Sequence, residues 1–196
     1  MSFLRRTLAA TVAVAAFPAL AAAQAFTGTG VSVTGGLDQR WDVSCTRLTS
    51  LMGSGICGGA LNVASAFVDA SVITAAPGGW ASVPVTSPFG NQVRYIGAEP
   101  SGSVNAGTPD EQARFQYTFR TTFNIAAGDV PFAQLVLNPF RIDNYWVGYV
   151  LNGGPLQTGG ISPTPAPPTG GNWTTPFTVA INSGFQAGTN TLDIVI

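Results

Sequence analysis

Residues that could carry acid-base, nucleophilic or metal chemistry are scarce in this chain. It contains nine Asp and Glu residues and eight Lys and Arg residues, and it has no histidine. Without histidine, the Ser-His-Asp and Cys-His arrangements of nucleophilic catalysis are excluded. A glycosidase needs two carboxyls that face each other across about 5–10 Å, and the adjacent pair Asp110 and Glu111 stands in a polar loop instead. We therefore expect a protein that is not an enzyme.

Asp143 and Asp193 are the candidates for metal binding, because carboxylate oxygens suit Ca²⁺. Asp143 precedes Asn144 at an expected strand corner, where an aspartate can instead bond backbone amides in a turn. Asp193 lies on the face opposite Leu192 and Ile194, so it is either a ligand or simply exposed. The chain has no dense acidic loop. We expect no cofactor, with a structural calcium ion as the alternative.

Cys45 and Cys57 are the two cysteines of the chain. In an exported protein an even pair usually forms a disulfide. A zinc site needs four ligands, and there is no histidine to complete one. The pair therefore predicts a disulfide that closes a glycine-rich loop.

Aromatic side chains are the candidates for ligand binding, because sugars stack on exposed rings. Trp173 lies in a Pro- and Gly-rich loop, where it either binds a sugar or caps the edge of the fold. The full set of candidate ligand-binding residues is Trp173, Trp80, Trp146 and Tyr145. The aromatic residues expected in the core are Trp41, Phe115, Tyr117, Phe119 and Phe123.

Residues 1–25 have the pattern of a secretory signal peptide. Arg5 and Arg6 precede an apolar stretch from Leu8 to Leu20, and small residues follow up to Ala25. Such a segment is too short for a membrane span and is removed on export. We expect residues 26–196 to be one secreted or cell-surface domain. No apolar run of about 18 residues follows the signal, so no membrane span is expected in the mature chain.

The composition is unusually poor in charge. Charged residues are 9% of the chain, against roughly a quarter in typical globular proteins. The surface must then consist largely of Thr, Ser, Asn, Gln and Gly. Without a basic patch to neutralise phosphates, nucleic acid is excluded as a partner. The same composition would suit a protein that packs against copies of itself.

The clearest element is a strand over Phe115–Ile125. Phe115, Tyr117, Phe119, Thr121, Phe123 and Ile125 share one face, and polar residues that include Arg120 share the other. Such alternation is typical of a half-buried antiparallel strand. On this register Phe119 is essential to the core, whereas replacing the outward Arg120 should change stability little.

A second strand is expected over Tyr145–Leu151, with Tyr145, Val147, Tyr149 and Leu151 on one face and Trp146 and Gly148 on the other. Further strands are expected from Arg40, over Leu61–Thr74, Val93–Ile96, Ala133–Leu137, Phe177–Ile181 and Leu192–Ile196. Pro139 requires an edge position or a bulge after its strand. A Pro- and Gly-rich loop covers residues 153–176. Many short strands with almost no helix signal predict an antiparallel β-sandwich or jelly roll.

Three stretches carry a resemblance to a known family. They are RFQYTFRTTFNI, FRIDNYWVGYVLNG and PFTVAINSGFQAGTNTLDIVI, and their order and spacing resemble the galactose-binding-like jelly roll of exported bacterial proteins of the PEP-CTERM kind. The early Leu37–Trp41 is similar to the first-strand motif of that group. The sequence stops at Ile196 without the group's Pro-Glu-Pro tail, so we expect either a released protein or a piece of a longer one.

The resemblance implies a non-catalytic domain that binds an extracellular glycan or associates with an exopolysaccharide matrix. The alternative, from the low charge, is a self-associating structural subunit at the cell surface. The loop between Cys45 and Cys57 departs from the family pattern, so the geometry of a ligand site near it does not carry over.

Overall fold

The computed structural model of the chain describes almost exclusively β-structure. The described residues are 29, 33–49, 55–73, 85–86, 92–93, 95–98, 115–140, 142, 146–160 and 177–196. Two short 3-10 helices, η1 (Gly55–Gly58) and η3 (Val130–Phe132), are the helical elements of this part of the chain. None of its helices is long and apolar enough to cross a membrane.

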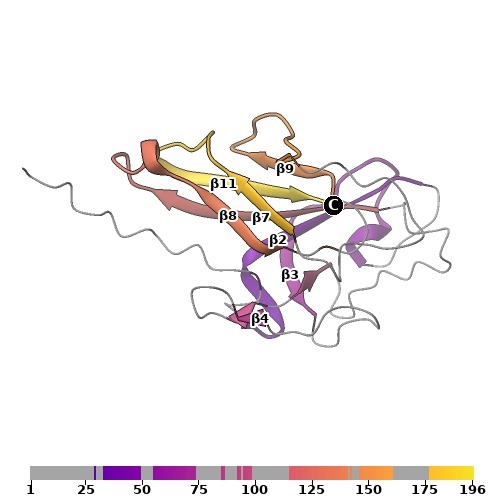
Figure 1. Cartoon of the computed structure of the whole chain (residues 1–196). Helices are drawn as coiled ribbons and strands as arrows, with labels where there is room; N and C mark the ends of the chain where they lie inside the picture. The colour runs from indigo at the N-terminus through magenta and orange to yellow at the C-terminus, as the bar shows by residue number, and fades with distance from the viewer. Residues whose placement is uncertain are drawn as a thin grey trace, which may run out of the picture.

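The larger sheet has the strand order β6-β3-β2-β7-β11-β9, and β1 pairs with β2 beside this path. All pairings between its named strands are antiparallel. Figure 1 shows β11 and β7 crossing the middle of the molecule, with β9 on one side and β2 and β3 on the other. The strands are β1 (Val33–Thr34), β2 (Leu37–Arg47), β3 (Val68–Val72), β6 (Ile96–Gly97), β7 (Phe115–Ile125), β9 (Gly148–Leu151) and β11 (Gly188–Val195).

The remaining strands form two antiparallel pairs. β8 (Leu135–Phe140) pairs with β10 (Phe177–Ile181), and β4 (Val85–Thr86) pairs with β5 (Gln92–Val93). In the first pair, Phe177 opposes Phe140 while Val179 opposes Leu137. β8 therefore holds one extra residue within the stretch that contains Pro139, which is the bulge that the proline predicts.

The alternation expected for β7 and β11 is confirmed. In β7, Phe119 and Thr121 are buried while Thr122 and Asn124 are exposed. In β11, Leu192 and Ile194 are buried and Ile194 lies opposite Phe119. The two strands are paired neighbours in the sheet, and both present their apolar rows to the same side.

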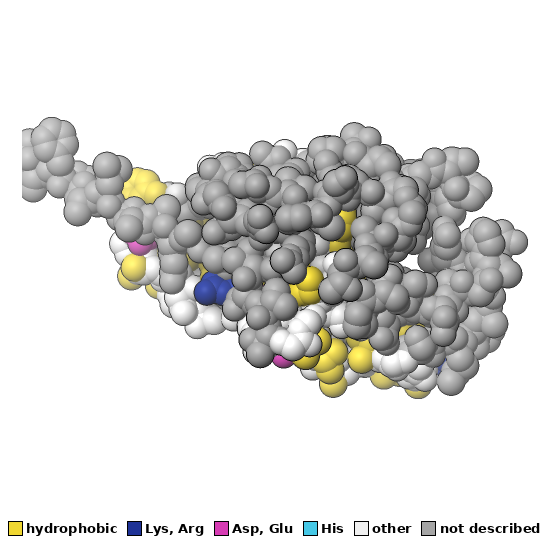
Figure 2. All heavy atoms as spheres, turned by 90° about the horizontal axis from the view of Figure 1, so that it is seen from below, with side chains coloured by type: hydrophobic (Ala, Val, Ile, Leu, Met, Phe, Trp, Pro, Cys, Tyr) yellow, Lys and Arg dark blue, Asp and Glu magenta, His cyan; other side chains and the backbone are white. Residues whose placement is uncertain are grey.

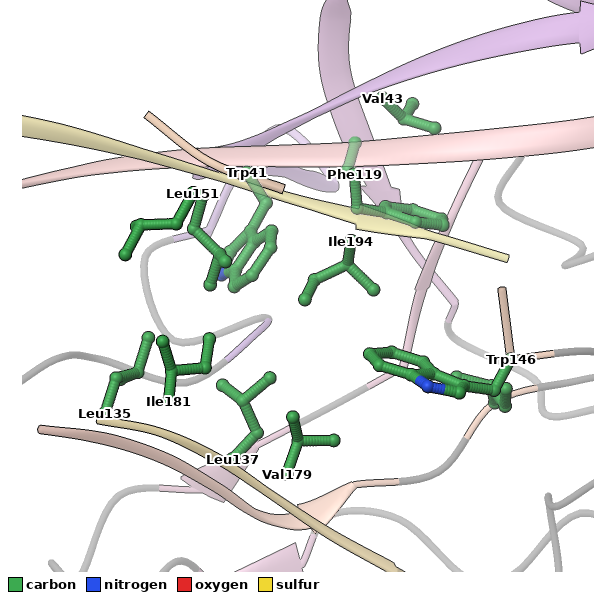
Figure 3. Close-up of a cluster of buried hydrophobic side chains, with 13 residues drawn as sticks. Trp41, Val43, Phe119, Leu135, Leu137, Trp146, Leu151, Val179, Ile181 and Ile194 are labelled. Atoms are coloured by element: carbon green, nitrogen blue, oxygen red, sulfur yellow. The ribbon is translucent and has the colours of Figure 1, made fainter. Parts of the chain in front are cut away.

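One core joins the two layers. Figure 3 shows Trp41, Phe119, Leu151 and Ile194 projecting from the large sheet toward the side chains of β8 and β10. The facing residues are Leu135, Leu137, Val179 and Ile181, all within the same buried cluster. Two antiparallel sheets that interdigitate in this way form a β-sandwich, which confirms the all-β fold class. A jelly-roll strand order stays a prediction.

β2 is longer than expected and carries a wide bulge. Asp38 opposes Ala70 and Asp42 opposes Asp69, so the residues between Asp38 and Asp42 have no partner in β3. The carboxylate of Asp38 is buried and accepts a hydrogen bond from the backbone N–H of Arg40 at 2.9 Å. The bulge turns Trp41 into the core, where it is 3% exposed, as expected.

Several predicted strand bounds are wrong. The strand expected over Leu61–Thr74 is β3 (Val68–Val72), because Asn62 takes a positive φ of 58° that interrupts an extended run. The strand expected over Tyr145–Leu151 is β9 (Gly148–Leu151). The expected strand Val93–Ile96 is split between β5 and β6. The segments 1–25 and 161–176, which include the predicted signal peptide and most of the predicted Pro- and Gly-rich loop, lie outside the described residues.

The four strands that alternate most clearly in the sequence, Phe115–Ile125, Tyr145–Leu151, Phe177–Ile181 and Leu192–Ile196, do not all lie in one sheet. β7, β11 and β9 are neighbours in the large sheet, whereas β10 pairs with β8 and contributes its apolar residues from the opposite layer. Alternation identifies a buried face, and it does not say which strand lies beside it.

Candidate functional site

Cys45 and Cys57 form the predicted disulfide. Their Cα atoms are 5.2 Å apart, within the range that a disulfide spans. Both are 1% exposed, and Ile56 and Tyr117 pack against them. Cys45 lies inside β2 rather than in a loop, so the bridge ties η1 directly to the large sheet.

Trp146 does not present a ring for ligand binding. Its side chain is 0% exposed, and its Nε1–H donates to the carbonyl oxygen of Thr158 at 2.8 Å. The expectation that Trp146 lies on the face opposite Leu151 is wrong, because the strand begins only at Gly148, whose φ of 154° interrupts the period-two pattern. Figure 3 shows its ring between the two layers of the sandwich.

The other candidate binding residues are not described. Trp80, Trp173, Tyr145 and Asp143 all lie outside the described residues. Their predicted roles in glycan and calcium binding therefore stay predictions.

Asp193 forms an ion pair with Arg120. The Nε and Nη2 atoms of Arg120 donate to Oδ1 and Oδ2 of Asp193 at 2.7 and 2.8 Å. Hydrogen bonding to Asp193 is the main cause that raises the pKa of Arg120. The guanidinium also lies 4.0 Å from the centre of the Phe67 ring, a cation–π contact. Both carboxylate oxygens of Asp193 thus have an arginine partner, and the described residues contain no group of three or more potential metal ligands.

The outer surface of β8 and β10 differs from that of the large sheet, because its described residues carry no charge. Since Leu135, Leu137, Val179 and Ile181 point into the core, the alternate residues point outward. We call this surface the neutral face, and its residues are Gln134, Val136, Thr178, Ala180 and Asn182 together with Phe132 of the adjoining turn η3, all exposed. Charged side chains are also sparse among the described atoms visible in Figure 2, where apolar and uncharged ones predominate.

Phe132 is the most exposed large apolar residue described, at 85%. It ends η3, in which the N–H of Phe132 bonds the carbonyl of Asp129 at 3.0 Å and that of Ala133 bonds Val130 at 3.2 Å. The ring of Pro131 fixes the φ angle of that residue, which stiffens the turn further. Figure 1 shows η3 at the end of the sandwich away from the C-terminus. The turn therefore holds the aromatic ring out in solvent on a stiff backbone.

Amide side chains complete the neutral face beside Phe132. Gln134 lies two residues further along the extended chain, and its Nε2 donates to Oδ1 of Asn182 at 2.7 Å. Asn182 follows β10 and begins the loop to β11. This hydrogen bond joins the two loops that connect the sheets at this end and leaves other donor and acceptor sites of both amides available.

Hydrogen bonds of Asn152 and Asn190 fix the adjoining loop. Asn152 donates through Nδ2 to the carbonyl of Gly184 at 2.9 Å and to Oδ1 of Asn190 at 2.8 Å. Asn190, which is 0% exposed, also accepts from the backbone N–H of Gln186. The β10–β11 loop is thereby held against the turn that follows β9, so the end of the sandwich is a rigid surface.

The sequence alone did not indicate Phe132. Aromatic residues beside alternating strands were assigned to the core, and Phe132 differs from them only in following Pro131 within the short connection between β7 and β8. That position was a usable signal, because loop aromatics with a constrained backbone are favourable contact residues.

Comparisons with known proteins do not assign the chain. No protein-family model, no curated protein and no solved structure matches it.

Proposed function

We propose that this chain is an exported, non-catalytic β-sandwich that binds a neutral extracellular glycan through the neutral face. The observation that carries the proposal is the combination of an 85% exposed Phe132 on a hydrogen-bonded turn with uncharged amide neighbours. A sugar ring offers an apolar C–H surface and several hydroxyls. An aromatic ring matches the first, and the amides of Gln134 and Asn182 match the second.

The uncharged character of the surface favours a neutral glycan over an acidic one. Recognition of a carboxylate or sulfate normally uses arginine, whose fork bonds two oxygens at once. The neutral face contains no arginine, and the guanidinium of Arg120 is bonded to Asp193 on the other sheet. Export rests on the predicted signal peptide over residues 1–25, and the absence of histidine supports a non-catalytic role.

Glycan binding can be tested with Phe132→Ala. The mature protein, applied to an array of neutral and acidic polysaccharides, is expected to bind neutral members. Loss of a central aromatic contact typically costs more than about 1 kcal/mol, so Phe132→Ala should weaken binding about tenfold, while Phe132→Trp should retain it. Leu156→Ala is the matched control, because Leu156 is also exposed but lies beyond β9.

Circular dichroism of each variant would establish that the fold is intact. Absence of binding to every glycan by folded wild-type protein would contradict the proposed function. Equal binding by wild type and Phe132→Ala would instead show that the site lies elsewhere on the molecule.

A self-associating structural subunit is the second candidate. It is favoured by an apolar surface near the end of β2, where Leu48, Leu61 and Val63 are 43%, 45% and 56% exposed. Leu61 and Leu48 are held close together because Leu61 forms a bridge with Arg47. Light scattering coupled to size exclusion tests this candidate, and a monomer that persists at high concentration would rule it out.

A further inference from the structure

The carboxyl groups of Asp42 and Asp69 face each other across β2 and β3. The two residues are Cα partners in the antiparallel register. Their chain neighbours Val43 and Ala70 are buried, so both carboxyls lie on the outer side of the large sheet. Like charges directly opposite on adjacent strands destabilise the pairing. The sheet therefore contains a built-in repulsion whenever both groups are ionised.

The charged groups around this pair do not cancel the repulsion. Asp42 is flanked by Asp69 from β3 and by Arg120 from β7. Arg120 is already bonded through two nitrogens to Asp193 of β11. On β2 itself, the carboxylate of Asp38 is buried and bonded to the backbone of Arg40. One guanidinium thus interacts with carboxylates on two strands, Asp193 of β11 and Asp42 of β2.

Asp42 is the member of the pair whose proton is held more tightly in the folded protein. Burial is the main cause that raises the pKa of Asp42 above its ordinary value of 3.8, and the negative charge of Asp69 adds to it against the opposing effect of Arg120. Asp69 is more exposed, and it accepts a hydrogen bond from Nε2 of Gln39 at 3.2 Å. Protonated Asp42 can then donate to Asp69.

We propose that Asp42 and Asp69 form a carboxyl pair that shares one proton, fastens β3 to β2 at acidic pH and loosens this junction when both groups ionise. The junction between the two strands is interrupted. β2 and β3 pair in two short stretches separated by the bulge between Asp38 and Asp42. Loosening would expose Ala70, Val72 and Ile73, which are buried at this side of the sheet.

The direction of the pH dependence follows from linkage. The folded protein holds the proton of Asp42 more tightly than the unfolded chain does. The stability that the protonated pair contributes is therefore fully present below a pH of 3.8, the ordinary pKa of the group. It is lost as the pH rises through the folded-state pKa. The direction is opposite to ordinary acid denaturation, in which carboxylates lose stabilising partners on protonation.

The test is hydrogen exchange of the full mature chain, followed by mass spectrometry of peptides that cover β3. Exchange is compared at about pH 3.5, below the ordinary pKa of an aspartate, and at about pH 7.5, after correction for intrinsic rates, with EDTA present to remove divalent cations. In the wild type, protection of residues 68–73 should fall a few-fold to about tenfold at the higher pH. Asp42→Asn keeps a hydrogen-bond donor for Asp69 and cannot ionise, so this variant should show nearly equal protection at the two pH values.

Asp42→Asn should also raise the Tm at neutral pH by about 2–4 °C, and this gain should shrink in about 1 M salt, which screens the repulsion. Asp69→Asn provides a second, independent variant with the same expected behaviour. Asp129→Asn is the control, because Asp129 precedes η3 without a side-chain cap bond. The inference is overturned if β3 protection in wild type does not fall with pH, or if either pair variant retains the full pH dependence.

Discussion

Arg120 connects several groups on the outer side of the large sheet. It bonds both oxygens of Asp193, contacts the Phe67 ring and lies opposite Asp42 in the register. Its side chain is 38% exposed and that of Asp193 is 15% exposed, so the pair is neither buried nor fully solvated. An exposed ion pair alone typically contributes about 0–1 kcal/mol. The bidentate geometry and the aromatic contact place the contribution of the Arg120–Asp193 pair at the upper end of this range.

Arg120→Ala is therefore expected to lower the free energy of unfolding by about 1–2 kcal/mol. The variant removes two charge-assisted hydrogen bonds and leaves Asp42 and Asp193 without their shared cation. Sequence reasoning treated Arg120 as an outward residue of little consequence, because alternation reveals the face and not the partners on it. Urea unfolding would measure the change, with the exposed Thr122→Ala as control.

A double-mutant cycle with Asp193→Asn isolates the pair itself. Additive effects of the two substitutions, or an Arg120→Ala variant as stable as Thr122→Ala, would show that the ion pair contributes nothing.

Trp146 and Phe132 show the limit of inference from residue type. Both are aromatic and both border strands, yet Trp146 is 0% exposed and Phe132 is 85% exposed. The difference depends on backbone geometry at Gly148 and on the turn η3, neither of which is visible in hydrophobic periodicity. The burial of Phe119, by contrast, follows from an alternation that continues through the eleven residues of β7.

At the scale of elements, the hairpin after β9 depends on a close approach of two backbones. Tyr149 and Gln157 exchange two hydrogen bonds, each of 2.8 Å. A Cβ atom on Gly148 would overlap the carbonyl oxygen of Gln157, and Gly148 has a φ of 154°. The hairpin also holds Thr158 at the Nε1–H of Trp146, so it covers one side of the core.

Gly148→Ala should therefore destabilise the protein by about 1–3 kcal/mol, the usual cost of forcing extra volume into a packed site. The exposed Gly128→Ala is a matched control, because an added Cβ there meets nothing within 4 Å. Thermal unfolding and tryptophan fluorescence would report stability and the environment of Trp146. A Gly148→Ala protein with the Tm of the Gly128→Ala control would refute the close-contact interpretation.

The strands predicted best are those that need only local information. β7 and β10 alternate cleanly and have the predicted bounds. β11 has the predicted buried face, but it begins at Gly188 rather than at Leu192. β2 was expected to end before Cys45, but it continues to Arg47 because it pairs with β7 along that whole stretch. Long-range pairing of this kind overrides the local signal of a glycine-rich loop after Cys45.

At the scale of the whole molecule, the two layers present chemically different outer surfaces. The large sheet exposes a charged row that includes Asp69, Asp42, Arg120 and Asp193. The β8–β10 layer exposes the neutral face. The sandwich class followed from many short strands and few helix signals. The pairing of β10 with β8 did not follow from the sequence. The residues that gather on the neutral face therefore could not be grouped from the sequence.

The central claim is that the neutral face binds a neutral glycan, and chemical-shift mapping tests it most directly. Two-dimensional ¹⁵N–¹H spectra of the mature protein would be recorded during titration with the neutral oligosaccharide that corresponds to the best polysaccharide on the array. The account predicts that the largest shifts fall on Phe132, Gln134, Val136, Ala180 and Asn182, with the amides of Asp42, Arg120 and Asp193 unchanged. Shifts concentrated on the charged row of the large sheet, or no shifts at a saturating concentration, would contradict it.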